Sequence, residues 1–244
     1  ISLTDSFDRR SAMENQLHAV DLSFVFIYAI RPNLSSGYPT EYDRRRRINL
    51  YGYDMRRGEI GCFLSHRLAW EKFLKTDQPV CCILEDDVIL SQDFISGLKS
   101  IFGMEKSYDL VRLYGVFSRK YIKLIEVLSG RWIVDYFEQP RGTQGYVLTR
   151  QAAIVLLKYT QTMYCAIDDM IDQEWGHGLR IYGVEPSLVT EDSGLTSSIG
   201  GRNNEASHAR RLLREFYRAA PEVRRQFLIM KKKLLLFSQK HLGL

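Results

Sequence analysis

Three consecutive carboxylates, Glu85-Asp86-Asp87, are the residues of this 244-residue sequence that point most clearly to chemistry. They directly follow the apolar run from Val80 to Leu84, which predicts a short buried strand. Because side chains alternate along an extended chain, Glu85 and Asp87 can point the same way. Two such carboxylates suit a hard divalent cation that keeps water ligands and bridges phosphates. The alternative is a solvated acidic turn after the strand.

A second acidic pair, Asp168-Asp169, stands near the start of a predicted helix. Carboxylates are favoured there by the helix dipole, so an N-terminal capping role is one interpretation. The other is a general base that removes a proton from a sugar hydroxyl. The residues alone leave both open.

A third group of candidates lies in the segment GEIGCFLSH, from Gly58 to His66. Its two glycines open a predicted helix and permit close approach of the backbone to a ligand, and a helix N-terminus favours an anion. Ser65 and His66 are adjacent on that helix and do not face each other, which disfavours a hydrolase. Taken alone, His66 is more typical of a buried, hydrogen-bonded histidine than of a catalyst. The sequence also lacks the glycine-rich and zinc-binding motifs of dehydrogenases, P-loop enzymes and zincins.

Strands alternate with helices through most of the chain, and this positions the candidates. The alternation predicts an α/β fold with a mostly parallel central sheet flanked by helices, which binds ligands at the carboxyl ends of its strands. An arginine run, Arg44 to Arg47, falls in a predicted loop over 31–49 and is either solvated or a contact for phosphate or an acidic substrate. We predict strands at 22–30, 80–84, 110–114, 132–137, 143–148 and 181–184, and helices at 7–20, 58–75, 91–102, 150–159 and 166–175.

Composition excludes several classes of protein. With 45% hydrophobic residues, 17 Gly and 6 Pro, the chain is neither disordered nor fibrous. Its four cysteines include the adjacent Cys81 and Cys82 inside a predicted strand and no CxxC pair, which disfavours disulfides and structural zinc and fits a reducing compartment. No apolar run approaches the roughly 18 residues of a membrane span, and no signal peptide is evident.

The net charge of +5 is concentrated at one end of the chain. Residues 202–244 contain eleven Lys and Arg against three Asp and Glu, a net +8, whereas residues 1–201 carry a net −3. We therefore predict a catalytic domain over 1–201 and a basic helical tail over 202–244. Apolar residues at 223, 227, 230, 234 and 237 predict an amphipathic helix that binds an anionic membrane surface, or packs on its own domain or a second subunit. An acidic body without a recognition motif disfavours nucleic acid.

Six segments, in order, resemble glycosyltransferase family 25, the bacterial lipooligosaccharide galactosyltransferases. The resemblance covers residue 1 to about residue 199. It rests on Ile1-Ser2-Leu3 with Asp8-Arg9-Arg10, GEIGCFLSH at 58–66, ILEDDV at 83–88, Gln144-Gly145-Tyr146 with Ala152-Ala153, Ala166-Ile167-Asp168 and Ser197-Ser198-Ile199. Ala166 stands where the family commonly has proline.

The resemblance implies a type A glycosyltransferase fold, an inverting mechanism, a UDP-sugar donor and usually Mn²⁺. It assigns Glu85, Asp86 and Asp87 to the metal and Asp168 to the base, with Asp169 as the alternative base. Substrate-binding roles fall to Arg9, Glu59, Ser65, His66, Gln144 and Gly145, while His177 or His208 is left open as a further metal ligand.

We expect galactose to pass from UDP-galactose to a lipooligosaccharide or lipopolysaccharide acceptor. The reaction would take place in the bacterial cytoplasm, on the inner face of the inner membrane. UDP-glucose or UDP-N-acetylglucosamine as donor, or a non-catalytic sugar-nucleotide-binding protein on the same fold, are the alternatives. The oligomeric state is not predicted.

Overall fold

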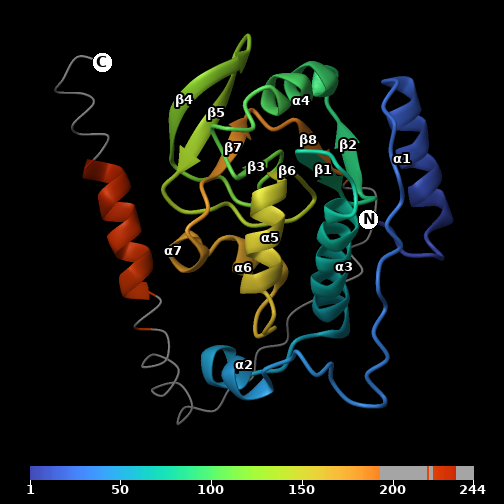
Figure 1. The fold of residues 1–244 in the computed structure, drawn as a ribbon, viewed down its shortest axis with the longest axis vertical. Helices are drawn as coiled ribbons and strands as arrows, with labels where there is room; N and C mark the ends of the chain where they lie inside the picture. Colours follow the sequence, from blue (N-terminus) through green and yellow to red (C-terminus); the bar gives the residue numbers. More distant parts are fainter. Residues whose placement is uncertain (193–218, 220–221, 235–244) are drawn as a thin grey trace.

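A six-stranded sheet forms the centre of the molecule (Figure 1). The computed structural model describes residues 1–192, 219 and 222–234. The strand order is β1-β6-β3-β7-β5-β4, and β2 and β8 form a separate two-stranded sheet. The strands are β1 (Val80–Leu84), β2 (Val88–Leu90), β3 (Leu110–Arg112), β4 (Tyr121–Leu128), β5 (Arg131–Tyr136), β6 (Gly145–Thr149), β7 (Ile181–Glu185) and β8 (Val189–Glu191).

Both faces of the central sheet are covered, which gives the body three layers. Alternate side chains of β6 show this, because Tyr146 and Leu148 join the apolar cluster built with α3, α5 and α6, whereas Val147 joins the one built with α1 and α4. The helices are α1 (Phe7–Ala19), α2 (Arg44–Tyr51), α3 (Arg57–Leu74), α4 (Phe94–Phe102), α5 (Arg150–Tyr159), α6 (Ile167–Ile171) and α7 (Glu174–His177).

The α/β class is confirmed, but the expectation of a mostly parallel sheet is wrong. Only β3 and β7 pair in parallel, and the other four neighbouring pairs are antiparallel. The error has a physical cause: all five residues of β6 are buried, because helices cover both faces of the sheet. A strand covered on both sides is apolar throughout whichever way its neighbours run, so composition does not reveal strand direction.

Two segments near the start of the chain also differ from expectation. Residues 22–30 form no buried strand; only an isolated bridge joins Tyr28 to Ser2, and Val25 is 81% exposed. The four arginines lie in helix α2, capped by the Asp43 carboxylate, which accepts a hydrogen bond from Arg46 N. Arg47 is buried, with its guanidinium over the ring of Tyr51. The run is therefore neither a solvated loop nor, at Arg47, free to contact a substrate.

Residues 222–234 form a helix that docks on the body, at the left of Figure 1. Its Lys232 is 9% exposed and donates from Nζ to Asp135 Oδ1 (2.6 Å), to the carbonyl of Tyr136 (2.9 Å) and to Glu174 Oε2 (2.9 Å). Ile229 is buried beside it. The predicted domain boundary at 201/202 lies outside the described residues. Among the described helices, none has the length and apolar content needed to cross a membrane.

Candidate functional site

The end of β1 opens into a cleft of about 530 Å³, which we call the acidic cleft. Its floor is the carboxylate triplet, and its walls come from α1, from the opening of α3 and from residues 29–32. Gly61 permits this arrangement, because a Cβ there would lie 2.5 Å from the carbonyl oxygen of Ile30. The predicted close approach at this glycine is thus real, but the approaching group is the chain's own backbone. The polar or titratable lining residues are Ser2, Asp5, Ser6, Arg9, Arg31, Arg57, Cys62, Ser65, His66, Glu85, Asp86 and Asp87.

Glu85 is held by two hydrogen bonds from different elements. Thr143 donates from Oγ1 to Glu85 Oε1 at 2.5 Å, and His66 Nε2 lies 3.2 Å from the same oxygen. Burial by itself would raise the pKa of Glu85, but these bonds to its charged form outweigh burial and lower the pKa. Glu85 therefore stays ionised through the neutral range.

The His66 imidazole is fixed in turn by a buried chain of hydrogen bonds. Its Nδ1 lies 2.8 Å from the Tyr146 hydroxyl, which accepts from Trp70 Nε1 at 2.9 Å. Trp70 can only donate, so the Tyr146 oxygen accepts from it, and the same hydroxyl pairs with His66 Nδ1 while Nε2 faces Glu85. His66 is thus a buried, hydrogen-bonded histidine that also borders the cleft.

Arg9 crosses from α1 to the other two carboxylates. Its Nη1 lies 3.2 Å from Asp86 Oδ1 and 3.5 Å from Asp87 Oδ2. Asp87 Oδ1 is buried and makes no hydrogen bond with any other described residue. Burial and the neighbouring charge of Glu85 raise the pKa of Asp87 to about 6. Arg9 thus reduces the electrostatic repulsion within the triplet. Asp87 Oδ1 still needs a cation or a hydrogen-bond donor to compensate for its burial.

The segment 141–143 joins the acidic cleft to the second acidic pair. Thr143 bonds to Glu85, the amide of Gly142 donates to Asp168 Oδ2 at 3.3 Å, and Arg141 Nε lies 3.3 Å from Asp169 Oδ1. Both aspartates occupy the first turn of α6, as expected. The acidic triplet and the Asp168-Asp169 pair are more than 80 residues apart in sequence. In the fold, both contact the same three-residue segment, 141–143.

The side chain of buried Arg112 holds the 141–143 segment through hydrogen bonds. It donates from Nη1 to the carbonyl of Gly142 and from Nη2 to Asp172, the residue after α6. Burial raises the pKa of Asp172 to about 7 against the opposing effect of Arg112. Arg112 ties the 141–143 segment to α6, which fixes the distance between Asp168 and the acidic cleft.

Three other predicted site residues, Glu59, Ser65 and Gly145, have structural roles, whereas Gln144 has a buried oxygen, Oε1, without a hydrogen-bond partner among the described residues. Glu59 accepts from Arg56 N at 2.8 Å and caps α3, and Ser65 Oγ donates to the carbonyl of Gly61 and accepts from Ile30 N. Gly145 lies in β6, packed against Leu84 and Val189. Of these four, Ser65 alone lines the acidic cleft, and their substrate contacts stay predictions.

His177 and His208 were the two candidates for a further metal ligand, and the structure bears on His177. His177 uses both ring nitrogens within the protein, since Nε2 bonds to the carbonyl of Ile171 and Nδ1 accepts from Leu179 N. Burial lowers its pKa to about 4. His208 and the sequence block at 197–199 lie outside the described residues. Among those that are described, Cys62, His66 and Glu85 also bring three ligand atoms within 4.8 Å of one another, but His66 and Glu85 already bond to each other.

A second cleft, of about 650 Å³, begins on the Asp169 side of the 141–143 segment, and we call it the aromatic cleft. Its walls come from α2, residues 137–141, α7 and the helix over 222–234. Its aromatic lining residues are Tyr51, Phe137, Tyr159, Tyr164 and Trp175. Sequence reasoning did not find this cleft, because its lining residues are dispersed along the chain.

The residues that position Glu85 were also missed. Trp70 follows His66 by four positions on α3, so both lie on one helix face, and Thr143 and Tyr146 flank the predicted Gln144-Gly145 pair. The sequence shows these positions, but it does not distinguish a side chain that positions Glu85 by a hydrogen bond from one that only packs in the core. Arg112 gave no signal beyond a charge within an apolar strand.

Comparisons with known proteins agree on one family. The profile of glycosyltransferase family 25, described as an LPS biosynthesis protein, matches residues 1–171. The lipooligosaccharide biosynthesis protein lic2B of Haemophilus influenzae is 28% identical over 206 residues, 80% of this chain and 76% of that protein. Procollagen galactosyltransferase 1-B of Xenopus laevis is 30% identical over 228 residues, 81% of this chain and 37% of that protein. The chain thus spans about a third of this animal relative.

Replacing Tyr146 with Phe tests the buried chain of hydrogen bonds. The change leaves Trp70 Nε1 and His66 Nδ1 buried without a partner, which we expect to lower the free energy of unfolding by about 1–3 kcal/mol. Chemical denaturation measures the difference. Tyr121→Phe is the control, because that side chain is 40% exposed and should change stability by less than about 0.5 kcal/mol. Equal stability of the two variants would refute the chain.

Proposed function

The chain belongs to glycosyltransferase family 25 and is a glycosyltransferase, and we propose that it transfers galactose from UDP-galactose to a lipooligosaccharide or lipopolysaccharide acceptor. The names of two relatives support this choice, since one is a lipooligosaccharide biosynthesis protein and another a procollagen galactosyltransferase. The covered central sheet is compatible with the type A fold, which we include in the proposal.

The observation that carries the proposal is the acidic cleft with its unsatisfied carboxylate. Asp87 Oδ1 is buried without a partner among the described residues, and Asp86 and Glu85 lie beside it. Hard carboxylate oxygens of this kind fit Mn²⁺ or Mg²⁺. We propose that Asp87, Asp86 and Glu85 hold the ion, which when bound supplies Lewis-acid stabilisation of the departing UDP. Arg9, already at these carboxylates, is placed to neutralise further negative charge from the diphosphate.

Asp168 is the proposed base for an inverting displacement. One of its oxygens accepts the Gly142 amide hydrogen at 3.3 Å, which orients the carboxylate, whereas Asp169 is engaged by Arg141. Asp168 would take the proton of an acceptor hydroxyl while that oxygen bonds to the anomeric carbon. The bond from that carbon to the β-phosphate oxygen breaks, and UDP leaves with the electron pair.

A panel of UDP-sugars with and without Mn²⁺, scored by UDP release with a lipooligosaccharide acceptor, tests the function. We expect turnover with UDP-galactose that requires the divalent ion. Asp168→Asn should lower kcat by about 10²–10⁴-fold with UDP binding retained. Asp169→Asn is the matched control, and a larger loss in that variant would move the base to Asp169. Faster turnover with another UDP-sugar would correct the donor, and no turnover with any would refute the function.

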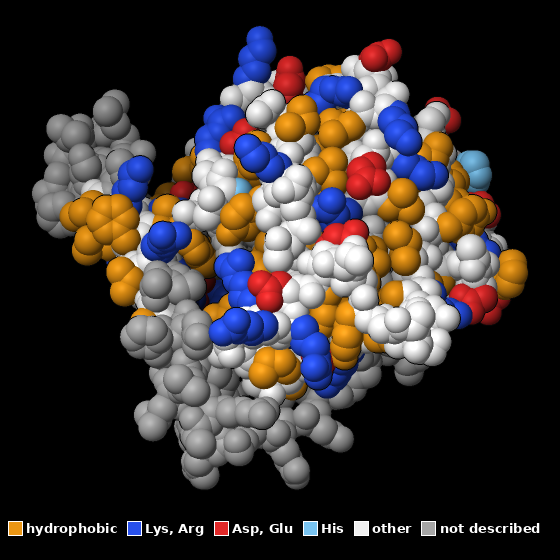
Figure 2. Space-filling view, turned by 60° about the horizontal axis from the view of Figure 1, so that its bottom comes forward, with side chains coloured by type: hydrophobic (Ala, Val, Ile, Leu, Met, Phe, Trp, Pro, Cys, Tyr) orange, Lys and Arg blue, Asp and Glu red, His pale blue; other side chains and the backbone are white. Residues whose placement is uncertain are grey.

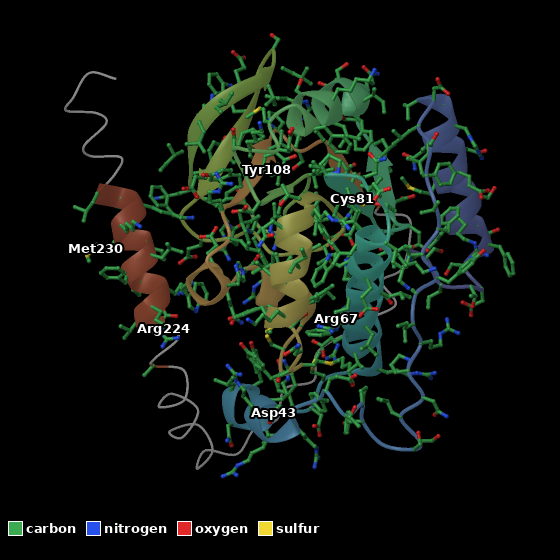
Figure 3. The ribbon with its side chains drawn as sticks, in the orientation of Figure 1. Asp43, Arg67, Cys81, Tyr108, Arg224 and Met230 are labelled. Carbon is green, nitrogen blue, oxygen red and sulfur yellow. The ribbon has the colours of Figure 1, made fainter. Side chains whose placement is uncertain are left out.

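We also propose that the helix over 222–234 attaches the enzyme to an anionic membrane surface, where a lipid-linked acceptor resides. One face docks on the body through Lys232 and Ile229, but the opposite apolar side chains are exposed: Val223 by 67%, Phe227 by 65%, Met230 by 52% and Leu234 by 63%. Met230 points away from the body (Figure 3). Basic and hydrophobic side chains lie together at this edge in Figure 2. That combination suits an interfacial helix.

Phe227→Glu tests this attachment in a flotation assay with vesicles of anionic and of zwitterionic lipid. Losing one buried aromatic ring should weaken binding to anionic vesicles by about tenfold or more. Phe7→Glu is the control, because Phe7 is also exposed, at 70%, but lies on α1. Binding that is the same in both variants and the unchanged protein would contradict the attachment.

A further inference from the structure

The aromatic cleft is lined by Asp169, the chain neighbour of the proposed base Asp168. Glu85 lines the acidic cleft, and Asp168 and Asp169 both lie in the first turn of α6. The 141–143 segment contacts all three carboxylates, and its Arg141 also lines the aromatic cleft. A molecule in the aromatic cleft would therefore lie beside the Asp168-Asp169 pair while a donor occupies the acidic cleft.

The lining of the aromatic cleft suits sugar rings. Its aromatic side chains offer flat apolar surfaces, on which the C–H faces of a pyranose can lie, and its charged groups can bond to hydroxyls at the ring edge. One of these rings, Tyr164, is already covered by the Arg46 guanidinium, 3.6 Å from the ring centre, which leaves the more exposed Trp175 as the aromatic surface for a sugar. Five arginines and five acidic residues line the cleft. That balance favours a polyhydroxylated ligand over a polyanion.

The docked helix forms one wall of this cleft, through Arg224, Arg225 and Leu228. Arg225 Nη1 lies 3.2 Å from Glu138 Oε1 on the facing wall. The position of the helix is set by Lys232, whose ammonium has three partners at the body. A buried ion pair of this kind fixes geometry, because any other register would leave Asp135 and Glu174 buried without their cation. Lys231 and Lys233, on either side, are exposed.

We propose that the aromatic cleft is the binding site for the acceptor oligosaccharide and that the helix over 222–234 is a built-in wall of it. The inference rests on the proposed function and adds the acceptor subsite. Trp175 is the proposed contact to the sugar, and Lys232 is a positioning residue that holds the wall in place. The helix then serves two purposes on two faces: one closes the acceptor site, and the other faces the membrane.

Calorimetric titration with the oligosaccharide released from lipooligosaccharide by delipidation tests the cleft without any lipid. We expect Trp175→Ala and Lys232→Met each to weaken oligosaccharide binding at least tenfold and to leave Mn²⁺-dependent UDP binding within twofold. Lys233→Met is the matched control, since it removes the same charge from the exposed face, and it should bind like the unchanged protein. A helix that serves only as a membrane anchor would leave oligosaccharide binding unchanged in Lys232→Met.

Two results would overturn the inference: equal oligosaccharide affinity in the Trp175→Ala variant and the unchanged protein, or no binding by the unchanged protein. These differ from failure of the proposed function. If UDP-sugar turnover occurs but Trp175→Ala binds normally, the acceptor lies elsewhere and the transferase assignment holds. If oligosaccharide binding depends on Trp175 but no donor is turned over, the cleft stands and the transferase proposal fails.

Discussion

The hydrogen bond from Thr143 to Glu85 is the contact on which the site depends. It anchors the 141–143 segment to the end of β1, and the same segment contacts Asp168 and Asp169. The buried chain of His66, Tyr146 and Trp70 positions the Glu85 carboxylate. Arg112 donates to the carbonyl of Gly142 in the same segment. The separation between the acidic triplet and the proposed base is therefore set by buried hydrogen bonds rather than by a mobile surface loop.

Charge explains why so many side chains are needed around so few carboxylates. Three adjacent acids repel one another. Thr143 and His66 contact Glu85, whereas Asp86 and Asp87 share one arginine, Arg9. The result is a lowered pKa at Glu85 and a raised pKa at Asp87. An arrangement that leaves one buried oxygen without a partner among the described residues is costly unless a ligand satisfies it. That cost is the physical argument for a cation at this position.

Local sequence signals found the pieces of the site, but not how they fit together. The apolar run before Glu85 predicted the strand, whereas the glycines of α3, expected to admit a ligand, admit the Ile30 carbonyl at Gly61. Strand direction was beyond reach, because both faces of the sheet are covered. The tail helix shows the same limit: its spacing predicted amphipathicity, but only the structure separates buried Lys232 from exposed Lys231 and Lys233. A contact partner 97 residues away, such as Asp135, leaves no local trace.

The central claim is that the acidic cleft holds a sugar nucleotide through a divalent ion at Asp87. Calorimetric titration of UDP with and without Mn²⁺, on the unchanged protein and on Asp87→Asn, tests it most directly. We expect Mn²⁺ to strengthen UDP binding at least tenfold in the unchanged protein and Asp87→Asn to abolish this gain. UDP affinity that is the same with and without Mn²⁺, or a full gain in Asp87→Asn, would contradict the claim.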